Sequence, residues 1–164
     1  MKVKEVMTQS AVCCEPETNV GKAVEVMWSR NVGMLPVVDN QGKLIGVVTD
    51  RDICIALGTR NLLPGVLTVG EIAVREVFTC KPNEDIHEAL SEMANHQVRR
   101  LPVVNDQGVP QGVLSMDDLI VHSELGKLRG ACDLSSEEVA ATMKKVYGLR
   151  QPVVPSTASN AAVH

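Results

Sequence analysis

Two stretches of the chain decide its fold, because they carry the same pattern. Residues 35–52 read LPVVDNQGKLIGVVTDRD, and residues 101–118 read LPVVNDQGVPQGVLSMDD. Each stretch contains two short apolar runs, separated by a turn-forming spacer that ends in Gly42 or Gly108. This arrangement is typical of a β-hairpin. We expect a helix to follow each hairpin directly, beginning at Asp50 or Asp117.

The similarity extends beyond these stretches and defines an internal repeat. Residues 3–53 align with residues 69–119 at a constant offset of 66, without a gap, and 16 of the 51 aligned positions are identical. Two copies are too few for a solenoid, so we expect one copy to pack against the other about a pseudo-twofold axis. Any cleft between the copies should then occur twice.

Each copy also contains a helix before its hairpin. Apolar residues recur at helical spacing and predict core-facing stripes formed by Val20, Ala23, Val24, Met27 and Trp28 in the first copy and by Ile86, Ala89, Leu90, Met93 and Ala94 in the second. The cap candidates are Thr18 or Asn19 for the first helix and Asp85 with Glu88 for the second. Thr68 with Glu71 predicts a further short helix. Pro36 and Pro102 predict edge strands or strand entries, because proline lacks a backbone donor.

The hydroxyl residue and the Asp after each hairpin have two interpretations. Thr49 and Ser115 are each followed three residues later by an acid, Asp52 and Asp118, which is a capping-box pattern. The same place is where a strand feeds a helix N-terminus, whose free N–H groups suit a phosphate. An ionised Asp one turn into the helix could accept hydrogen bonds from a ribose diol. The pattern alone leaves both interpretations open.

Composition excludes several classes of function. The chain has 164 residues, a formal net charge of −4 and only Trp28, Phe78 and Tyr147 as aromatic residues, which is unfavourable for a nucleic-acid binder. Five cysteines without C-x-x-C spacing indicate free thiols, and the four histidines lack metal-ligand spacing. No nucleophile has a neighbouring base, so we expect no catalysis. No signal peptide or membrane span is evident, which favours a cytoplasmic location.

The motifs together resemble the tandem CBS (cystathionine-β-synthase) domain pair, or Bateman module, over about residues 3–121. The resemblance is carried in both copies by the opening segment, the first helix, the LPVV strand, Gly46 or Gly112, and the hydroxyl-x-x-Asp motif. It implies a mixed α+β (α/β) fold of two pseudo-symmetric repeats. Each repeat would be a small three-stranded sheet with two helices, and the repeats would pack through their sheets.

The resemblance also implies a function and a set of site residues. The expected function is a stand-alone regulatory module that binds AMP, ADP, ATP or another adenosine compound, requires no cofactor or metal, and performs no catalysis. One cleft would use Arg99, Arg100, Ser115 and Asp118 with Met7, Val12 and Val32. The other would use Thr49, Arg51 and Asp52 with Ala73, Phe78 and Val98. We expect stronger phosphate binding at the first cleft, because copy one has Gly33 and Met34 where copy two has two arginines. Adjacent strand residues face opposite sides, so at most one of these arginines should reach a ligand.

The predicted organisation is a first repeat (1–57), a connector (58–68), a second repeat (69–121), a C-terminal helical extension (122–150) and a mobile tail (151–164). Val139, Met143 and Val146 or Tyr147 give the extension one apolar stripe, which must pack on its own repeat, on a second copy or on a partner. The resemblance implies a homodimer acting on a protein effector in trans. The alternatives are a structural scaffold in which the motifs only cap helices, and, less favoured, a nucleic-acid-binding regulator.

Overall fold

A computed structural model describes residues 1–123 and 134–148 of the chain. The first repeat contains helix α1 (Val20–Arg30), strands β2 (Met34–Val38) and β3 (Leu44–Thr49), and helix α2 (Asp50–Arg60). Helix α2 therefore extends into the predicted connector. The predicted tail, residues 151–164, lies outside the described residues.

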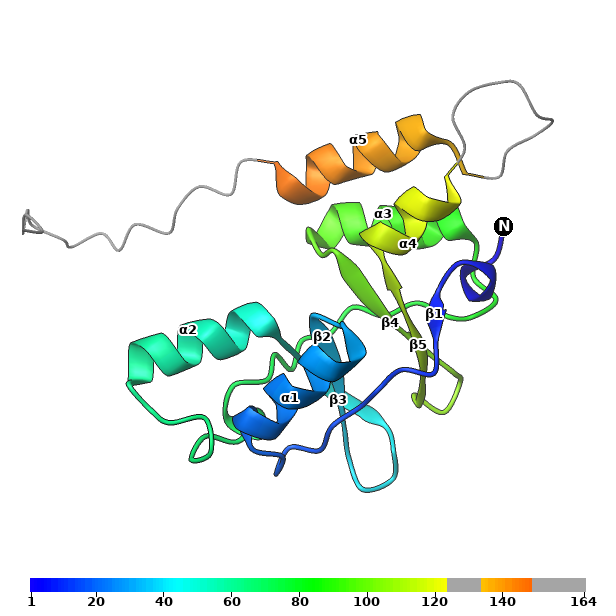
Figure 1. Ribbon diagram of the computed structural model, residues 1–164. Helices are drawn as coiled ribbons and strands as arrows, with labels where there is room; N and C mark the ends of the chain where they lie inside the picture. The colour runs from blue at the N-terminus through cyan, green and yellow to red at the C-terminus, as the bar shows by residue number, and fades with distance from the viewer. Residues whose placement is uncertain (124–133, 149–164) are drawn as a thin grey trace, which may run out of the picture.

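The second repeat has the same order of elements. It contains helix α3 (Ile86–His96), strands β4 (Arg100–Val104) and β5 (Pro110–Ser115), and helix α4 (Met116–His122). Helices α1 and α2 lie in one half of the structure and α3 and α4 in the other (Figure 1). Helix α4 begins one residue earlier than predicted, because the side chain of Ser115 caps it. The mixed α/β fold expected from the repeats is confirmed.

The opening segments of the two repeats are exchanged between the two cores. The 3-10 helix η1 (Val3–Glu5) begins the chain, and Val3 and Val6 are buried in the core of the second repeat. The 3-10 helix η2 (Val69–Glu71) is the counterpart of η1, and it belongs to the core of the first repeat. Each repeat therefore completes the hydrophobic core of the other.

The same exchange determines the sheets. Strand β1 (Thr8–Gln9) comes from the first repeat but pairs with β5, which gives a three-stranded antiparallel sheet in the order β1-β5-β4. The other sheet contains only β2 and β3, and the counterpart of β1 is reduced to a single bridge between Val47 and Val74. The prediction of three strands in each sheet is therefore confirmed for the sheet that contains β5. It is wrong for the sheet that contains β3, because Val74 pairs with that sheet through one bridge only. Strands β2 and β4 lie at sheet edges, which explains how Pro36 and Pro102 are tolerated.

Helix caps form at the predicted places. Asn19, rather than Thr18, caps α1 by accepting a hydrogen bond of 2.8 Å from the backbone N–H of Lys22. Asp85 and Glu88 form the capping box of α3. The predicted apolar stripe of α3 is buried at Ile86, Ala89, Leu90 and Met93.

The predicted stripe of α1 is only partly buried. Val20, Ala23 and Met27 lie in the core, but Val24 is 43% exposed and Trp28 is 87% exposed. The prediction that Trp28 faces the core is wrong, because in the described residues no helix covers that side of α1. The corresponding side of α3 is covered by helix α5.

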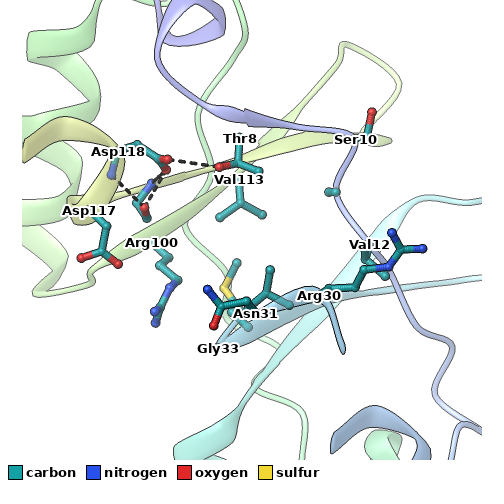
Figure 2. Close-up of a pocket in the computed structure, with 14 residues that line it drawn as sticks. Thr8, Ser10, Val12, Arg30, Asn31, Gly33, Arg100, Val113, Asp117 and Asp118 are labelled. Carbon is teal, nitrogen blue, oxygen red and sulfur yellow. Dashed lines mark hydrogen bonds between the residues drawn. The ribbon is translucent and has the colours of Figure 1, made fainter. Parts of the chain in front are cut away.

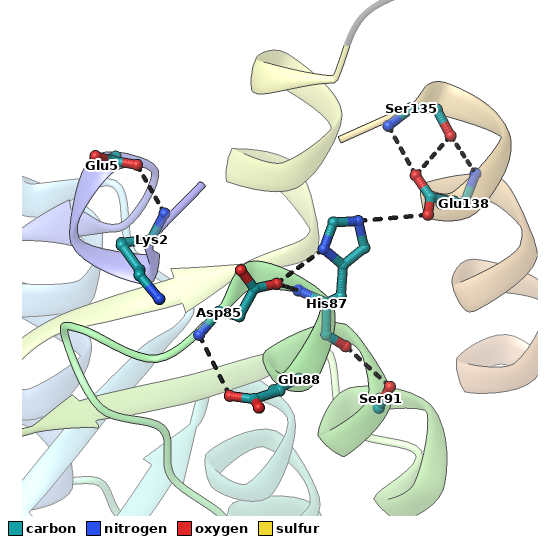
Figure 3. A network of polar contacts seen from close by, with 8 residues as sticks. All are labelled: Lys2, Glu5, Asp85, His87, Glu88, Ser91, Ser135 and Glu138. Carbon is teal, nitrogen blue, oxygen red and sulfur yellow. Dashed lines mark hydrogen bonds and ion pairs between the residues drawn. The ribbon is translucent and has the colours of Figure 1, made fainter. Parts of the chain in front are cut away.

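Helix α5 (Ser136–Tyr147) is the predicted C-terminal helix, and it packs on its own repeat, against α3 and α4. Its residues Val139 and Val146 are buried in the core of the second repeat. Figure 3 shows a polar contact at its N-terminal end, where His87 Nε2 lies 3.4 Å from Glu138 Oε1. His87 Nδ1 lies 2.8 Å from Asp85 Oδ1. The backbone N–H and ring of His87 hold the pKa of the Asp85 carboxyl below its ordinary value.

Within residues 1–123 and 134–148, no helix combines the length and apolar character needed to cross a lipid bilayer.

The exchanged segments require close backbone approach at two glycines. A Cβ at Gly112 would lie 2.5 Å from the carbonyl oxygen of Thr8, and a Cβ at Gly46 would lie 3.0 Å from that of Val74. We predict that Gly112→Ala lowers the free energy of unfolding by about 1–3 kcal/mol, because the β1–β5 pairing must shift. Gly46→Ala should have the smaller effect of the two. Denaturant unfolding monitored by circular dichroism measures both.

The matched control is Gly58→Ala in helix α2, where a Cβ would meet no atom within 4 Å. Because alanine favours helices, this change should raise stability by up to about 1 kcal/mol. Equal effects of Gly112→Ala and Gly58→Ala would contradict the close-approach argument.

Candidate functional site

Two clefts lie where the opening segments cross from one core to the other. The Asp118 cleft has a volume of about 400 Å³ and is lined by residue 8, by residues 10–12 and 30–34, and by Arg100, Val113, Ser115, Asp117 and Asp118. The Asp52 cleft has a volume of about 460 Å³ and is lined on its corresponding sides by residue 74, by residues 76–78 and 97–100, and by Val47, Thr49, Arg51 and Asp52. Most lining positions of one cleft correspond to those of the other at the offset of 66. The two clefts are therefore related by the pseudo-symmetry.

The hydroxyl and carboxylate of each motif are bonded to each other. Ser115 Oγ donates to Asp118 Oδ2 at 2.6 Å, and the backbone N–H of Ser115 donates to the same oxygen at 2.8 Å. Thr49 and Asp52 repeat this arrangement at 2.6 and 3.0 Å. The capping-box interpretation is thus confirmed for both motifs. It does not exclude the other interpretation, because both carboxylates also line a cleft.

The second carboxylate oxygen differs between the clefts. Asp118 Oδ1 accepts a hydrogen bond from Thr8 Oγ1 at 3.1 Å, as Figure 2 shows. The counterpart of Thr8 is Val74, which has no side-chain donor. Among the residues that the structure describes, none donates to Asp52 Oδ1. Within the described part of the chain, Asp52 Oδ1 therefore accepts no hydrogen bond, whereas Asp118 Oδ1 already accepts one from the crossing segment.

The predicted residues of the first set mostly gather at the Asp118 cleft. The structure places Val12, Val32, Arg100, Ser115 and Asp118 in its lining. Met7 does not line the cleft, but packs against the core of the second repeat. Thr8 lies there instead, because successive residues of an extended segment face opposite sides.

The second set shows the same agreement and the same displacement. Thr49, Arg51, Asp52, Phe78 and Val98 line the Asp52 cleft. Ala73 packs against the core of the first repeat, and the next residue, Val74, lines the cleft.

Arg99 lies on the other cleft from the one predicted. It lines the Asp52 cleft, whereas Arg100 borders both clefts. The Arg100 guanidinium lies against Gly33, where a Cβ would come within 3.2 Å of Arg100 Nη2. Arg99 is exposed, and its guanidinium lies 5.7 Å from the centre of the Tyr147 ring on α5. The two neighbouring arginines thus point in different directions, as expected for adjacent strand residues.

This placement reverses the expected charge difference between the clefts. The Asp52 cleft is lined by three arginines, Arg51, Arg99 and Arg100, and by two acids, Asp52 and Glu76. The Asp118 cleft is lined by two arginines, Arg30 and Arg100, and by two acids, Asp117 and Asp118. The Asp52 cleft is therefore the more basic of the two, because Arg99 lies there and not at the Asp118 cleft.

Some lining residues were missed from the sequence. Arg30 and Asp117 line the Asp118 cleft, and Glu76 lines the Asp52 cleft. The offset of 66 is a signal that could have found Asp117, since its counterpart is the predicted residue Arg51. The counterpart of Arg30 is His96, whose ring stacks on Phe78 with centroids 3.6 Å apart.

Outside the clefts, the described residues contain no metal-binding cluster. In residues 1–123 and 134–148, no group of three or more His, Cys, Asp or Glu side chains could hold a metal ion. Cys13, Cys14, Cys54 and Cys80 are free thiols, and Cys132 and His164 lie outside the described residues. Burial raises the pKa of Cys14 to about 11 and that of Cys80 to about 12.

The family of the chain follows from its match to known sequences. The model of the CBS domain matches twice, at residues 3–59 and 69–124. The chain belongs to the CBS domain family. The CBS domain-containing protein YhcV of Bacillus subtilis is 36% identical over 129 residues, which cover 79% of this chain and 90% of that protein.

Solved CBS structures share the fold. The CBS domain pair of protein MJ0100, in complex with 5′-methylthioadenosine and S-adenosyl-L-methionine, has a TM-score of 0.67 and 26% identity, covering 73% of this chain and 92% of that one. CBSX2 in complex with AMP has a TM-score of 0.63 and 25% identity, and the match covers 73% of this chain and 93% of that one. Related CBS pairs thus bind adenosine compounds.

The cysteines should differ in reactivity, because the thiolate is the reactive form. In a Cys132→Ser variant, we predict that iodoacetamide at pH 8 modifies the exposed Cys54 first and the buried Cys80 last. Mass spectrometry of peptides over time measures the order. Equal rates at Cys54 and Cys80 would contradict the burial of Cys80.

Proposed function

We propose that this CBS pair is a stand-alone regulatory module that binds adenine nucleotides or other adenosine compounds in its two clefts. The observation that carries the proposal is the repeated arrangement itself. In each cleft, a hydroxyl–carboxylate pair at a helix start faces the crossing segment of the other repeat, with arginine side chains beside it. The solved relatives that hold methylthioadenosine, S-adenosylmethionine or AMP support this choice of ligand class.

The Asp52 cleft is the better site for a nucleotide with several phosphates. Asp52 Oδ1 can accept hydrogen bonds from ribose hydroxyls without losing the cap, which uses Oδ2. Arg51 and Arg99 can pair with phosphate, and Phe78 and Val98 offer apolar contact for a base. These contacts provide one group for each part of a nucleotide.

The Asp118 cleft suits a less charged adenosine compound. Its arginines and acids balance, and Asp117 stands where the other cleft has Arg51. A ribose hydroxyl that donates to Asp118 Oδ1 would share this oxygen with Thr8, because a carboxylate oxygen can accept two hydrogen bonds. Since Thr8 lies on the crossing segment, the shared acceptor would link ligand binding to the contact between the repeats.

The output of the module would be a change of shape or of affinity for a protein effector in trans. The chemistry that both clefts share is binding chemistry, with carboxylates held in caps rather than placed beside a nucleophile. We therefore propose no catalytic activity and no required cofactor.

A scaffold without a ligand is the second candidate, and one observation favours it. Both motif carboxylates already accept two hydrogen bonds in their own capping boxes, so their presence is explained without a ligand. The open Oδ1 of Asp52 and the arginines beside it are the features that a cap does not require.

Thermal unfolding with ligands separates the two candidates. A compound that binds only the folded state stabilises it by about 2.7 kcal/mol at a hundredfold excess over Kd. We expect AMP, ADP, ATP or S-adenosylmethionine to raise the Tm, and Asp52→Asn to weaken nucleotide binding by about tenfold or more. Asp50→Asn, on the same helix but outside the cleft lining, is the control. No shift with any of the four compounds would favour the scaffold.

Arg99 and Arg100 should have different effects on binding. Arg99→Ala should weaken ATP and ADP at the Asp52 cleft by about two- to fivefold, a modest factor because Arg99 is exposed. Arg100→Ala should weaken binding at both clefts, because Arg100 borders both. Calorimetric titration in Asp52→Asn and Asp118→Asn backgrounds assigns each effect to one cleft. Unchanged affinity in Arg99→Ala would remove Arg99 from the site.

A further inference from the structure

The two clefts differ in the side chain that each offers to the base of a ligand. Phe78 lines the Asp52 cleft, and its counterpart in the Asp118 cleft is Val12. An aromatic ring can contact a purine through its face or its edge, and it covers more of the base than a valine does. Phe78 is therefore the residue of the Asp52 cleft best suited to a base.

A histidine outside the lining of the cleft packs on this ring. The His96 imidazole lies over one face of the Phe78 ring, with centroids 3.6 Å apart and an angle of 14° between the ring planes. His96 is the last residue of helix α3 and does not line the Asp52 cleft, whereas Phe78 does. His96 can therefore act on the cleft through Phe78, without touching a ligand.

The imidazole is itself held in place. His96 Nε2 lies 3.3 Å from Glu92 Oε2, one turn earlier on the same helix. The helix is a rigid support, and the contact with Glu92 limits the rotation of the imidazole. One face of Phe78 is thus covered by a fixed ring, so the Phe78 side chain has less freedom to lose when a ligand binds.

The first repeat has no equivalent of this arrangement. The counterparts of Glu92, His96 and Phe78 are Val26, Arg30 and Val12. Arg30 and Val12 both line the Asp118 cleft directly. The stacked pair is therefore a difference between the two clefts and not a general feature of the repeat.

We propose that His96 is a positioning residue that holds Phe78 for contact with the purine base of a ligand in the Asp52 cleft. The ligand class of this cleft is then compounds with an intact base, and not sugar phosphates in general. The Asp118 cleft, which lacks both rings, should depend less on the base. The inference rests on the proposed function, because it concerns the ligand of the same cleft.

The first test needs no ligand. Phe78 is the only phenylalanine of the chain, so ¹³C-labelled phenylalanine gives ring signals in NMR spectra from this residue alone. We expect His96→Ala to speed the flipping of the Phe78 ring, because one of its faces becomes free. Asn95→Ala is the matched control, since Asn95 is an exposed residue of the same helical turn, and it should leave the flipping rate unchanged.

The second test titrates the full chain with AMP and with ribose 5-phosphate, which lacks the base, and follows the Phe78 signals. AMP should bind more tightly than ribose 5-phosphate. His96→Ala should weaken AMP by about three- to tenfold and change ribose 5-phosphate by less than about twofold. His96→Tyr keeps an aromatic ring and should restore the affinity for AMP. A variant that only damaged the fold would weaken both probes and would not be restored in this way.

A double-mutant cycle shows whether His96 acts through Phe78. Phe78→Leu alone should weaken AMP, and His96→Ala should then have little further effect. Calorimetric titration of AMP in an Asp118→Asn background measures the four affinities at the Asp52 cleft. Thermal unfolding confirms that each variant folds.

Three results would overturn the inference and leave the proposed function standing. They are an unchanged flipping rate in His96→Ala, an unchanged affinity of that variant for AMP, and an equal effect of His96→Ala with and without Phe78. Absence of binding by every adenosine compound would contradict the proposed function and the base contact together. The flipping rate would still decide whether His96 holds Phe78.

Discussion

The structure depends on the close approach of each opening segment to a strand of the other repeat. At Gly112 the backbone of Thr8 comes so near that a side chain does not fit without a shift, and Gly46 approaches the backbone of Val74 less closely. This approach carries Val3 and Val69 into opposite cores. The segments must then cross back between the repeats, and the crossing creates the two clefts. The exchange of the opening segments therefore produces both the two cores and the two clefts.

Much of this arrangement could be predicted from the sequence, because equivalent residues in the two copies form equivalent local structures. The hairpins, the capping boxes and the pair of clefts all follow from residues that recur at an offset of 66. The errors have local causes. The motif predicts Met7 at the cleft, but Thr8 lines it, since a displacement of one residue in an extended segment exchanges the core and cleft faces. The helical spacing predicts Trp28 in the core, because it identifies an apolar stripe but not the element that covers it.

The motif aspartates show how one side chain can serve stability and binding together. A carboxylate has two oxygens, and the cap uses only Oδ2 of Asp52 and Asp118. The cap fixes the carboxylate at the cleft wall, so little conformational entropy is lost when the other oxygen takes a ligand. The repeats have diverged at this point, because Thr8 bonds to Asp118 whereas Val74 cannot bond to Asp52.

One cationic side chain, that of Arg100, lies in the lining of three hollows. Its side chain borders the Asp118 cleft, the Asp52 cleft and a third hollow between α1 and α2. A single guanidinium cannot turn fully toward three neighbours at once, so an anion that attracts it into one hollow withdraws positive charge from the other two. Competition for this shared charge makes the three hollows thermodynamically interdependent, even if the backbone does not move.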